Sequence, residues 1–242
     1  MRFYDHIRNM LEQLEQQETE TITQAAALMA EAIEKKKCIW AFGTTHANLV
    51  AKDMVYRTGG LAVINPIPAP GMDLDVMPFT LSSQMERYER YGADLIRYRG
   101  VGEGDVVILH SVSGRNTVMI DAALAAKELG AQVIVITNLA FSEHSESRHP
   151  SGKLLYELGD VVIDNCGEPG DACLSFPGLP AKVAPTSTVM GGIVASALIE
   201  KTVEMLLERG VHVPVLMSAN MPGGDEYNDR MFEAYKDQIH YM

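Results

Sequence analysis

The residue types best suited to chemistry gather in one short polar segment, Ser111 to Thr117. An apolar run, Val106–Leu109, precedes it, and an alanine-rich helical pattern, Val118–Leu129, follows it. A strand, a small polar loop and a helix in this order direct backbone N–H groups toward an anion, and hydroxyl and amide side chains add donors. The segment therefore predicts a phosphate-binding loop. It is equally typical of an ordinary strand–helix turn with Asn116 or Ser113 as the N-cap, and no Walker lysine follows it.

A second small polar loop, Gly43-Thr44-Thr45-His46, lies between an apolar run at 38–42 and a helical pattern at 47–57. Further apolar runs are at 61–64, 106–110, 132–136 and 161–164, and helical patterns separate them. Five such strands predict an α/β fold of three layers, with a doubly wound parallel sheet in the flavodoxin-like order 2-1-3-4-5. That order places the first and third strands side by side at the switch point, so the two polar loops are expected to flank one crevice.

Other segments are expected to surround this sheet. Residues 3–36 show apolar residues at helical spacing in two groups, which predicts an N-terminal pair of helices that packs on the domain or on a partner subunit. We place these helices at 1–37 and the rest of one structural domain at 38–242. The proline-rich stretch 65–80 predicts an ordered loop or lid, and a helix is expected from Leu81 to about Ile96. A long helix at 186–209 and a docked C-terminal helix complete the chain.

The composition limits the classes of partner. The formal net charge of −12 argues against nucleic acid or an anionic membrane surface. No apolar run approaches the roughly 20 residues that a membrane-spanning helix needs. The three cysteines form no CxxC pair, which favours a reduced, cytoplasmic protein without disulfides.

Three segments together resemble the signatures of SIS (sugar isomerase) domains. Ser111–Thr117 is similar to the SxSGx(S/N/T) motif, Phe42–His46 stands at the first glycine loop, and Ala184–Thr188 resembles the third conserved segment. Their order and spacing match over residues 38–209. The stretches 149–153 and 170–172 resemble a subgroup of stand-alone bacterial SIS proteins without assigned substrates.

The resemblance implies a phosphosugar ligand, a flavodoxin-like sheet, and assembly as a homodimer or a higher homo-oligomer. It implies no cofactor, and its members include phosphosugar isomerases, an etherase acting on an amino-sugar phosphate, and sensor modules. The ligand contacts that it implies are Gly43, Thr44, Thr45, Ser111, Ser113, Gly114, Asn116, Thr117, Ser187 and Thr188.

The catalytic residues of phosphoheptose isomerases have no counterparts here. Their glutamate after the first loop is missing at 54–57, and their Gln-Glu pair and histidine are missing at 189–197. Aldose–ketose isomerisation needs a proton-transferring base and a ring-opening donor. We assign these roles to Glu86, covered by the proline-rich lid, and to His46 at the crevice. Glu86 could equally lie on a solvated helix face, and His46 could simply cap its helix.

Several further side chains have two interpretations each. Glu89 and His149 are the next candidates for the base, and Asp171 could line the pocket or brace its loop. His110, at the end of a strand, fits a buried core histidine. The histidines lack the spacing of metal ligands, so no metal site is predicted. A sugar-phosphate isomerase is the leading interpretation, with an etherase-like lyase and a non-catalytic phosphosugar sensor as alternatives.

Overall fold

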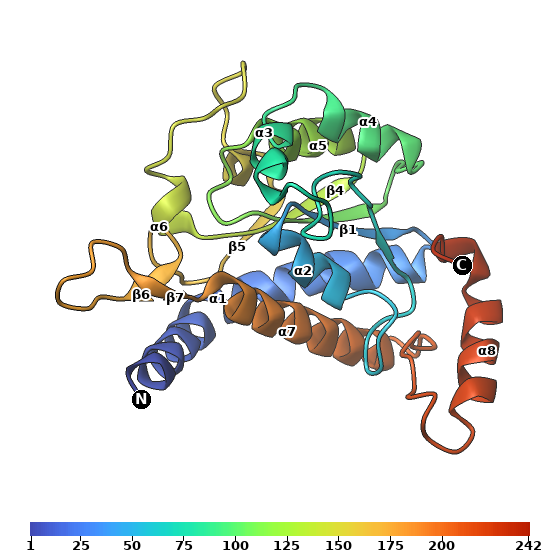
Figure 1. Ribbon diagram of the computed structural model, residues 1–242. Coiled ribbons are helices and arrows are strands. Elements are labelled where there is room, and N and C mark those ends of the chain that lie inside the picture. Colours follow the sequence, from blue (N-terminus) through green and yellow to red (C-terminus); the bar gives the residue numbers. More distant parts are fainter.

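A five-stranded parallel sheet in the order β2-β1-β3-β4-β5 forms the centre of the protein (Figure 1). The computed structural model describes residues 1–242. The strands are β1 (Ile39–Gly43), β2 (Ile64–Pro66), β3 (Val106–His110), β4 (Gln132–Thr137) and β5 (Val161–Asp164). The predicted α/β fold class and strand order are confirmed. β1 pairs with β3, with Gly43 opposite His110, so the loops that follow these two strands start at the same level of the sheet.

Successive side chains of the strands enter two separate hydrophobic cores, because the side chains of a strand alternate between its faces. Ile39 and Ala41 join the core under α1 (Arg2–Glu34), α2 (His46–Asp53) and α7 (Ser187–Glu208). Trp40 and Phe42 join the core under α4 (Tyr91–Tyr98) and α5 (Thr117–Glu128). The result is the expected three-layer arrangement, visible in Figure 1 with α1 and α7 on one side and α4 and α5 on the other.

The predicted N-terminal pair of helices is wrong, because one continuous helix, α1, runs for 33 residues. The polar stretch between Leu14 and Ile22 contains no glycine or proline and consists mostly of helix-forming residues, so nothing ends the helix there. α1 lies along α7 of the same chain, and Arg209 pairs with Glu34 at 3.1 Å. Figure 1 shows its N-terminal turns projecting beyond the sheet.

The single helix expected from Leu81 to about Ile96 is also wrong. The chain forms a 3-10 turn, η1 (Phe79–Leu81), then α3 (Ser82–Met85), and resumes only at α4. The break includes Arg90, whose φ of 70° is left-handed. Residues 86–90 therefore leave the helical path beside the N-terminus of α5, and this places Glu86 at the carboxyl edge of the sheet.

The remaining elements are short connections and the tail. They are α6 (Leu139–Ser142), η2 (Leu155–Leu158), the antiparallel hairpin β6 (Ala172–Leu174) and β7 (Val183–Pro185), α8 (Gly224–Ala234) and η3 (Lys236–Gln238). The three cysteines are free. None of the helices combines the length and the apolar character that crossing a bilayer requires.

Candidate functional site

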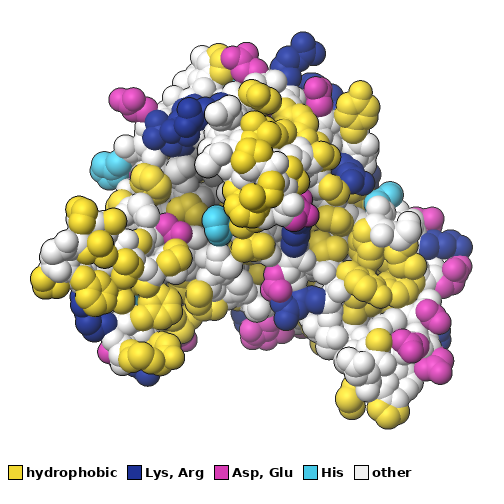
Figure 2. Space-filling model, viewed as in Figure 1, with side chains coloured by type: hydrophobic (Ala, Val, Ile, Leu, Met, Phe, Trp, Pro, Cys, Tyr) yellow, Lys and Arg dark blue, Asp and Glu magenta, His cyan; other side chains and the backbone are white.

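A cleft of about 390 Å³ opens at the carboxyl edge of the sheet, where the loops after β1 and β3 meet. It is lined by Thr44, Thr45, His46, Ala47, Glu86, Ser111, Val112, Ser113, Asn116, Phe141, Gly170, Asp171 and Ser187. Figure 2 shows the molecule hollowed between α2, α3 and α6, with Lys and Arg side chains gathered at the upper rim of the hollow. The cleft has the size of a small-molecule site and lies at the switch point, as the sheet order predicts.

The loop between β3 and α5 forms the floor of the cleft. The buried Ser111 hydroxyl accepts a hydrogen bond from the Gly114 N–H at 3.3 Å, which closes the turn. Gly114 has a φ of 59°, and a Cβ there would stand 3.2 Å from that of Leu155. A side chain at position 114 would therefore be both strained and crowded. The Ser113 hydroxyl has no hydrogen-bond partner within the chain and borders the cleft, so it is free to bind a ligand.

The loop between β1 and α2 forms the opposite wall. A Cβ on Gly43 would lie 2.7 Å from the Ala47 backbone, so only glycine fits this turn. The proline-rich stretch is fastened to this wall, because the Thr45 N–H donates to Met72 O at 3.1 Å. Asp73 accepts a hydrogen bond from Asn48 and pairs with Lys52 at 3.0 Å. The stretch is thus an ordered loop, as predicted.

The Glu86 carboxylate is held between these two walls. One oxygen accepts a hydrogen bond from the Asn116 amide at 2.6 Å, and the other lies 3.5 Å from the Thr45 hydroxyl. The Glu86 carbonyl accepts from the Val118 N–H at 3.1 Å, in the first turn of α5. Glu86 is half-buried whereas Glu89 is exposed, so the solvated helix face proposed as the alternative applies to Glu89.

The third wall comes from the N-terminus of α7. Asp171 accepts hydrogen bonds from the Thr186 N–H at 3.0 Å, from the Ser187 N–H at 2.7 Å and from the Ser187 hydroxyl at 2.9 Å. A carboxylate at this position satisfies free N–H groups and complements the helix dipole. Asp171 therefore both lines the cleft and braces the segment that presents Ser187.

Eight of the twelve sequence-predicted site residues line the cleft: Thr44, Thr45, His46, Glu86, Ser111, Ser113, Asn116 and Ser187. The other four do not. Gly43 and Gly114 shape the loops, the Thr117 hydroxyl donates to Arg148 O at 3.1 Å, and Thr188 is exposed. Among the lining residues that sequence reasoning missed, Ala47 and Val112 adjoin the predicted loops, while Phe141 of α6 carries no sequence signal.

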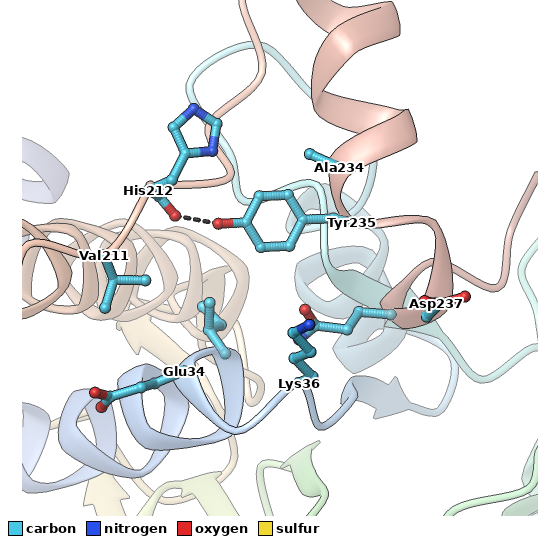
Figure 3. A pocket seen from close by; sticks show the side chains of 9 residues that line it. Glu34, Lys36, Val211, His212, Ala234, Tyr235 and Asp237 are labelled. Carbon is cyan, nitrogen blue, oxygen red and sulfur yellow. Dashed lines mark hydrogen bonds between the residues drawn. The ribbon is translucent and has the colours of Figure 1, made fainter.

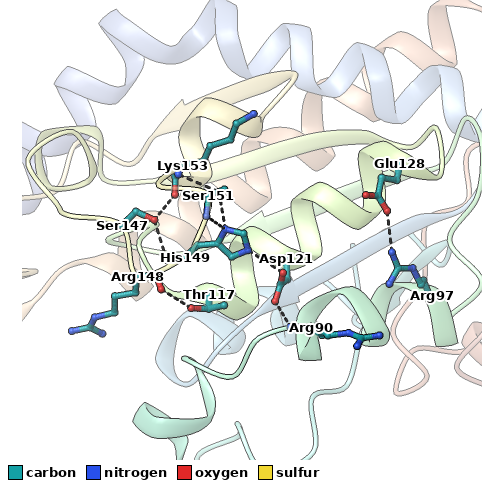
Figure 4. A network of polar contacts seen from close by, with 10 residues as sticks. All are labelled: Arg90, Arg97, Thr117, Asp121, Glu128, Ser147, Arg148, His149, Ser151 and Lys153. Carbon is teal, nitrogen blue, oxygen red and sulfur yellow. Dashed lines mark hydrogen bonds and ion pairs between the residues drawn. The ribbon is translucent and has the colours of Figure 1, made fainter.

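Two histidines that were considered for the site have structural surroundings. His110 is buried, its Nδ1 lies 2.9 Å from Ala47 O, and burial lowers its pKa, which fits the core interpretation. His149 lies outside the cleft. Its Nε2 is 3.1 Å from an Asp121 oxygen, and Figure 4 shows the two side chains directed at each other.

A second cavity of about 330 Å³ lies at the opposite end of the molecule, between the ends of α1 and α7 and the C-terminal tail. Figure 3 shows the Tyr235 hydroxyl directed at the carbonyl of His212 across its upper side. None of the sequence-predicted site residues lines it. No group of three His, Cys, Asp or Glu side chains lies close enough together to hold a metal ion.

The class of protein follows from the comparison with known families. The model of the SIS domain matches residues 2–138, and the chain belongs to this family. Its curated relatives include UPF0309 proteins of Shouchella clausii, 48% identical, and of Oceanobacillus iheyensis, 47% identical. The alignments cover 100% and 99% of this chain, and 98% of each relative.

Solved structures of phosphoheptose isomerases share the fold. The enzyme GmhA from Neisseria gonorrhoeae superposes with a TM-score of 0.53 at 20% identity, covering 84% of this chain and 97% of that chain. The enzyme from Francisella tularensis gives 0.56 at 14% identity, covering 84% and 95%. At such identities the likeness establishes the fold.

Proposed function

We propose that this protein binds a sugar phosphate in the cleft and isomerises it between aldose and ketose forms. One observation carries the proposal: the loop between β3 and α5, which contains Ser113 and precedes the N-terminus of α5, faces the same cleft as the Glu86 carboxylate. The loop supplies donors for a phosphate, and Glu86 supplies a base beside it. Membership of the SIS family and the shared fold with phosphoheptose isomerases support the phosphosugar as ligand.

In the proposed binding mode, the phosphate occupies the head of α5. Backbone N–H groups of the loop, the hydroxyls of Ser111 and Ser113, and the dipole of the helix all favour an anion there. Thr44, Thr45 and Ser187 contact the sugar from the other two walls. The Asn116 side-chain NH2 group has two N–H donors, so one can stay bonded to Glu86 while the other donates to the ligand.

In the proposed reaction, the Glu86 carboxylate removes the proton from C2 of the open-chain sugar and returns it to C1. Through the enediol, the carbonyl moves from C1 to C2 as the proton of the O2 hydroxyl moves to O1. The hydrogen bond from Asn116 at 2.6 Å fixes the orientation of the carboxylate. His46, exposed at the start of α2 and lining the cleft, donates the proton that opens the ring.

The protein as proposed acts in the cytoplasm, without a cofactor, as a homodimer or a higher homo-oligomer. Helix α7, whose first half is rich in small residues, and the projecting N-terminal turns of α1 are surfaces available for a second copy (Figure 1).

The test is the exchange of sugar-phosphate protons with deuterated solvent, followed by NMR across a panel of hexose, pentose and amino-sugar phosphates. We expect one member to exchange its C2 proton and to interconvert with its isomer. The variant Glu86→Gln keeps the shape of the residue and should lose at least about 100-fold in rate, within the usual range for a general base. The exposed neighbour Glu89→Gln is the matched control and should retain full activity.

Two results would redirect the proposal. Full turnover by Glu86→Gln would move the base elsewhere. A ligand that binds tightly but exchanges no proton would favour the sensor, and release of an alkoxy or acyloxy group would favour the lyase.

A further inference from the structure

We propose that the ligand of the cleft carries a second acidic group besides its phosphate, and that Arg87, Arg115 and Arg148 bind it. This inference rests on the proposed function and narrows it to sugar phosphates that bear an additional carboxylate or a second phosphate.

The first observation is that none of these arginines forms a salt bridge. The protein has 32 acidic residues against 20 basic ones, and four of its other eight arginines pair with carboxylates, as Arg57 does with Asp53 and Arg209 with Glu34. No carboxylate lies within 4.0 Å of the guanidinium groups of Arg87, Arg115 or Arg148. In addition, the buried Nε of Arg115 has no hydrogen-bond acceptor. Buried donors are almost always paired in native proteins, so an acceptor supplied by a ligand is expected.

The second observation is that each of the three arginines adjoins a residue of the cleft, Glu86 or Asn116, in sequence or through a hydrogen bond. Arg115 adjoins the phosphate loop, and its carbonyl accepts from the Arg148 N–H at 2.9 Å. Arg148 Nη1 donates to Asn116 Oδ1 at 2.8 Å, beside Glu86. Burial lowers the pKa of Arg148, and the nearby charges of Arg115 and Arg87 lower it further, while the charge of Glu86 acts in the opposite direction. An anion bound among them would offset these positive charges.

The third observation is that the chain holds this arrangement in place from outside the cleft. Asp121 on α5 joins the two segments that carry Arg87 and Arg148. One of its oxygens accepts from the Arg90 N–H at 2.6 Å, and the other lies 3.1 Å from His149 Nε2 (Figure 4). Asp121 is therefore a positioning residue, and binding an anion requires little rearrangement of the backbone.

A monophosphate alone leaves this set of charges incompletely matched. The loop amides, the hydroxyls and the helix terminus already serve one phosphate, and Glu86 offsets only one of the three guanidinium charges. Guanidinium groups form paired hydrogen bonds with carboxylates and phosphates alike, so both acids fit the same chemistry.

The test is a calorimetric titration with three probes: glucose 6-phosphate, 6-phosphogluconate, which adds a carboxylate, and fructose 1,6-bisphosphate, which adds a phosphate. We expect at least one of the two diacids to bind roughly tenfold to a hundredfold more tightly than the monophosphate, the range of a charge-assisted pair. The probe that gains identifies which acid the rim selects.

Arg148→Gln and Arg87→Gln should each remove about tenfold of that preference. Arg87 has no hydrogen bond to the site, so its variant tests the charge alone. Arg230→Gln, an exposed arginine on α8, is the matched control and should leave all affinities unchanged. Asp121 does not contact the ligand in this proposal, so Asp121→Asn should reduce the preference for diacids only by displacing the arginines. A normal unfolding midpoint for this variant would show that the loss comes from positioning and not from unfolding.

Two outcomes overturn the inference. The first is a monophosphate affinity equal to that of both diacids in the parent. The second is an equal loss for mono- and diacids in Arg87→Gln and Arg148→Gln, which would assign the arginines to the phosphate itself. Both leave the proposed function intact, provided that Ser113→Ala weakens the monophosphate. If no phosphate binds at all, the proposed function fails as well.

Discussion

Replacing Asp171 with alanine should destabilise the protein and weaken ligand binding at the same time. The Asp171 carboxylate accepts three hydrogen bonds of 3.0 Å or less, from the N–H groups of Thr186 and Ser187 and from the Ser187 hydroxyl, and a longer one of 3.5 Å from the Thr186 hydroxyl. It holds the first turn of α7, a helix of 22 residues that packs along α1 and covers one core. No other side chain caps this helix terminus.

The size of the effect follows from the number of bonds and the exposure of the group. Hydrogen bonds to a charged acceptor contribute about 1.5–3 kcal/mol each when buried. Asp171 is half-buried, so water replaces part of each bond, and about 1 kcal/mol per bond is the appropriate estimate. The alanine variant should therefore lose about 3 kcal/mol of unfolding free energy.

Asp171→Asn is the matched control. It keeps an oxygen for the two backbone N–H groups and tolerates the left-handed φ of 69°, losing only the bond from the Ser187 hydroxyl. We expect a loss of about 1 kcal/mol. Urea unfolding measures both variants, and the midpoint shift should be largest for alanine. If Asp171→Ala lost less than about 0.5 kcal/mol, or less than Asp171→Asn, the capping role described here would be wrong.

Three further predictions address packing, pH dependence and assembly. Gly92→Ala should destabilise by about 3 kcal/mol although alanine favours helices, because a Cβ would stand 1.8 Å from Val118 O; calorimetry showing a stable variant would contradict this contact. Burial raises the pKa of Glu18 and of its neighbour Asp164, so the folded state holds their protons more tightly and loses stability as pH rises through that range. Glu18→Gln should accordingly raise the unfolding midpoint at pH 7 and have little effect near pH 4, and the opposite trend would refute the assignment. Light scattering at micromolar concentration should give at least a dimer, and a monomer would remove the proposed assembly.

Much of the architecture could be predicted because its signals are local. The strands are continuous apolar runs, and the small polar loops directly follow two of them. The order of the strands then brings the Ser113 loop and the Thr45 loop to one crevice by topology alone. The position of Ser113 in the cleft is thus a consequence of its place after β3.

The parts that could not be predicted depend on contacts between distant segments. The break that brings Glu86 into the cleft depends on its carbonyl meeting the Val118 N–H, a pairing that no periodicity reports. The bond of Thr117 to Arg148 O similarly turns a hydroxyl away from the expected ligand. α1 was expected to be two helices because its apolar pattern is interrupted, but a polar stretch alone does not end a helix.

The measurement that tests the central claim most directly is the affinity of the parent and of Ser113→Ala for one sugar phosphate and for the same sugar without phosphate. The ligand is the sugar phosphate that most raises the melting temperature in a thermal-shift screen. The parent should bind the phosphosugar far more tightly than the free sugar. Ser113→Ala should weaken the phosphosugar by about 1.5 kcal/mol or more and leave the free sugar nearly unchanged. Equal affinities in the parent, or an equal loss for both ligands, would contradict phosphate binding at the head of α5.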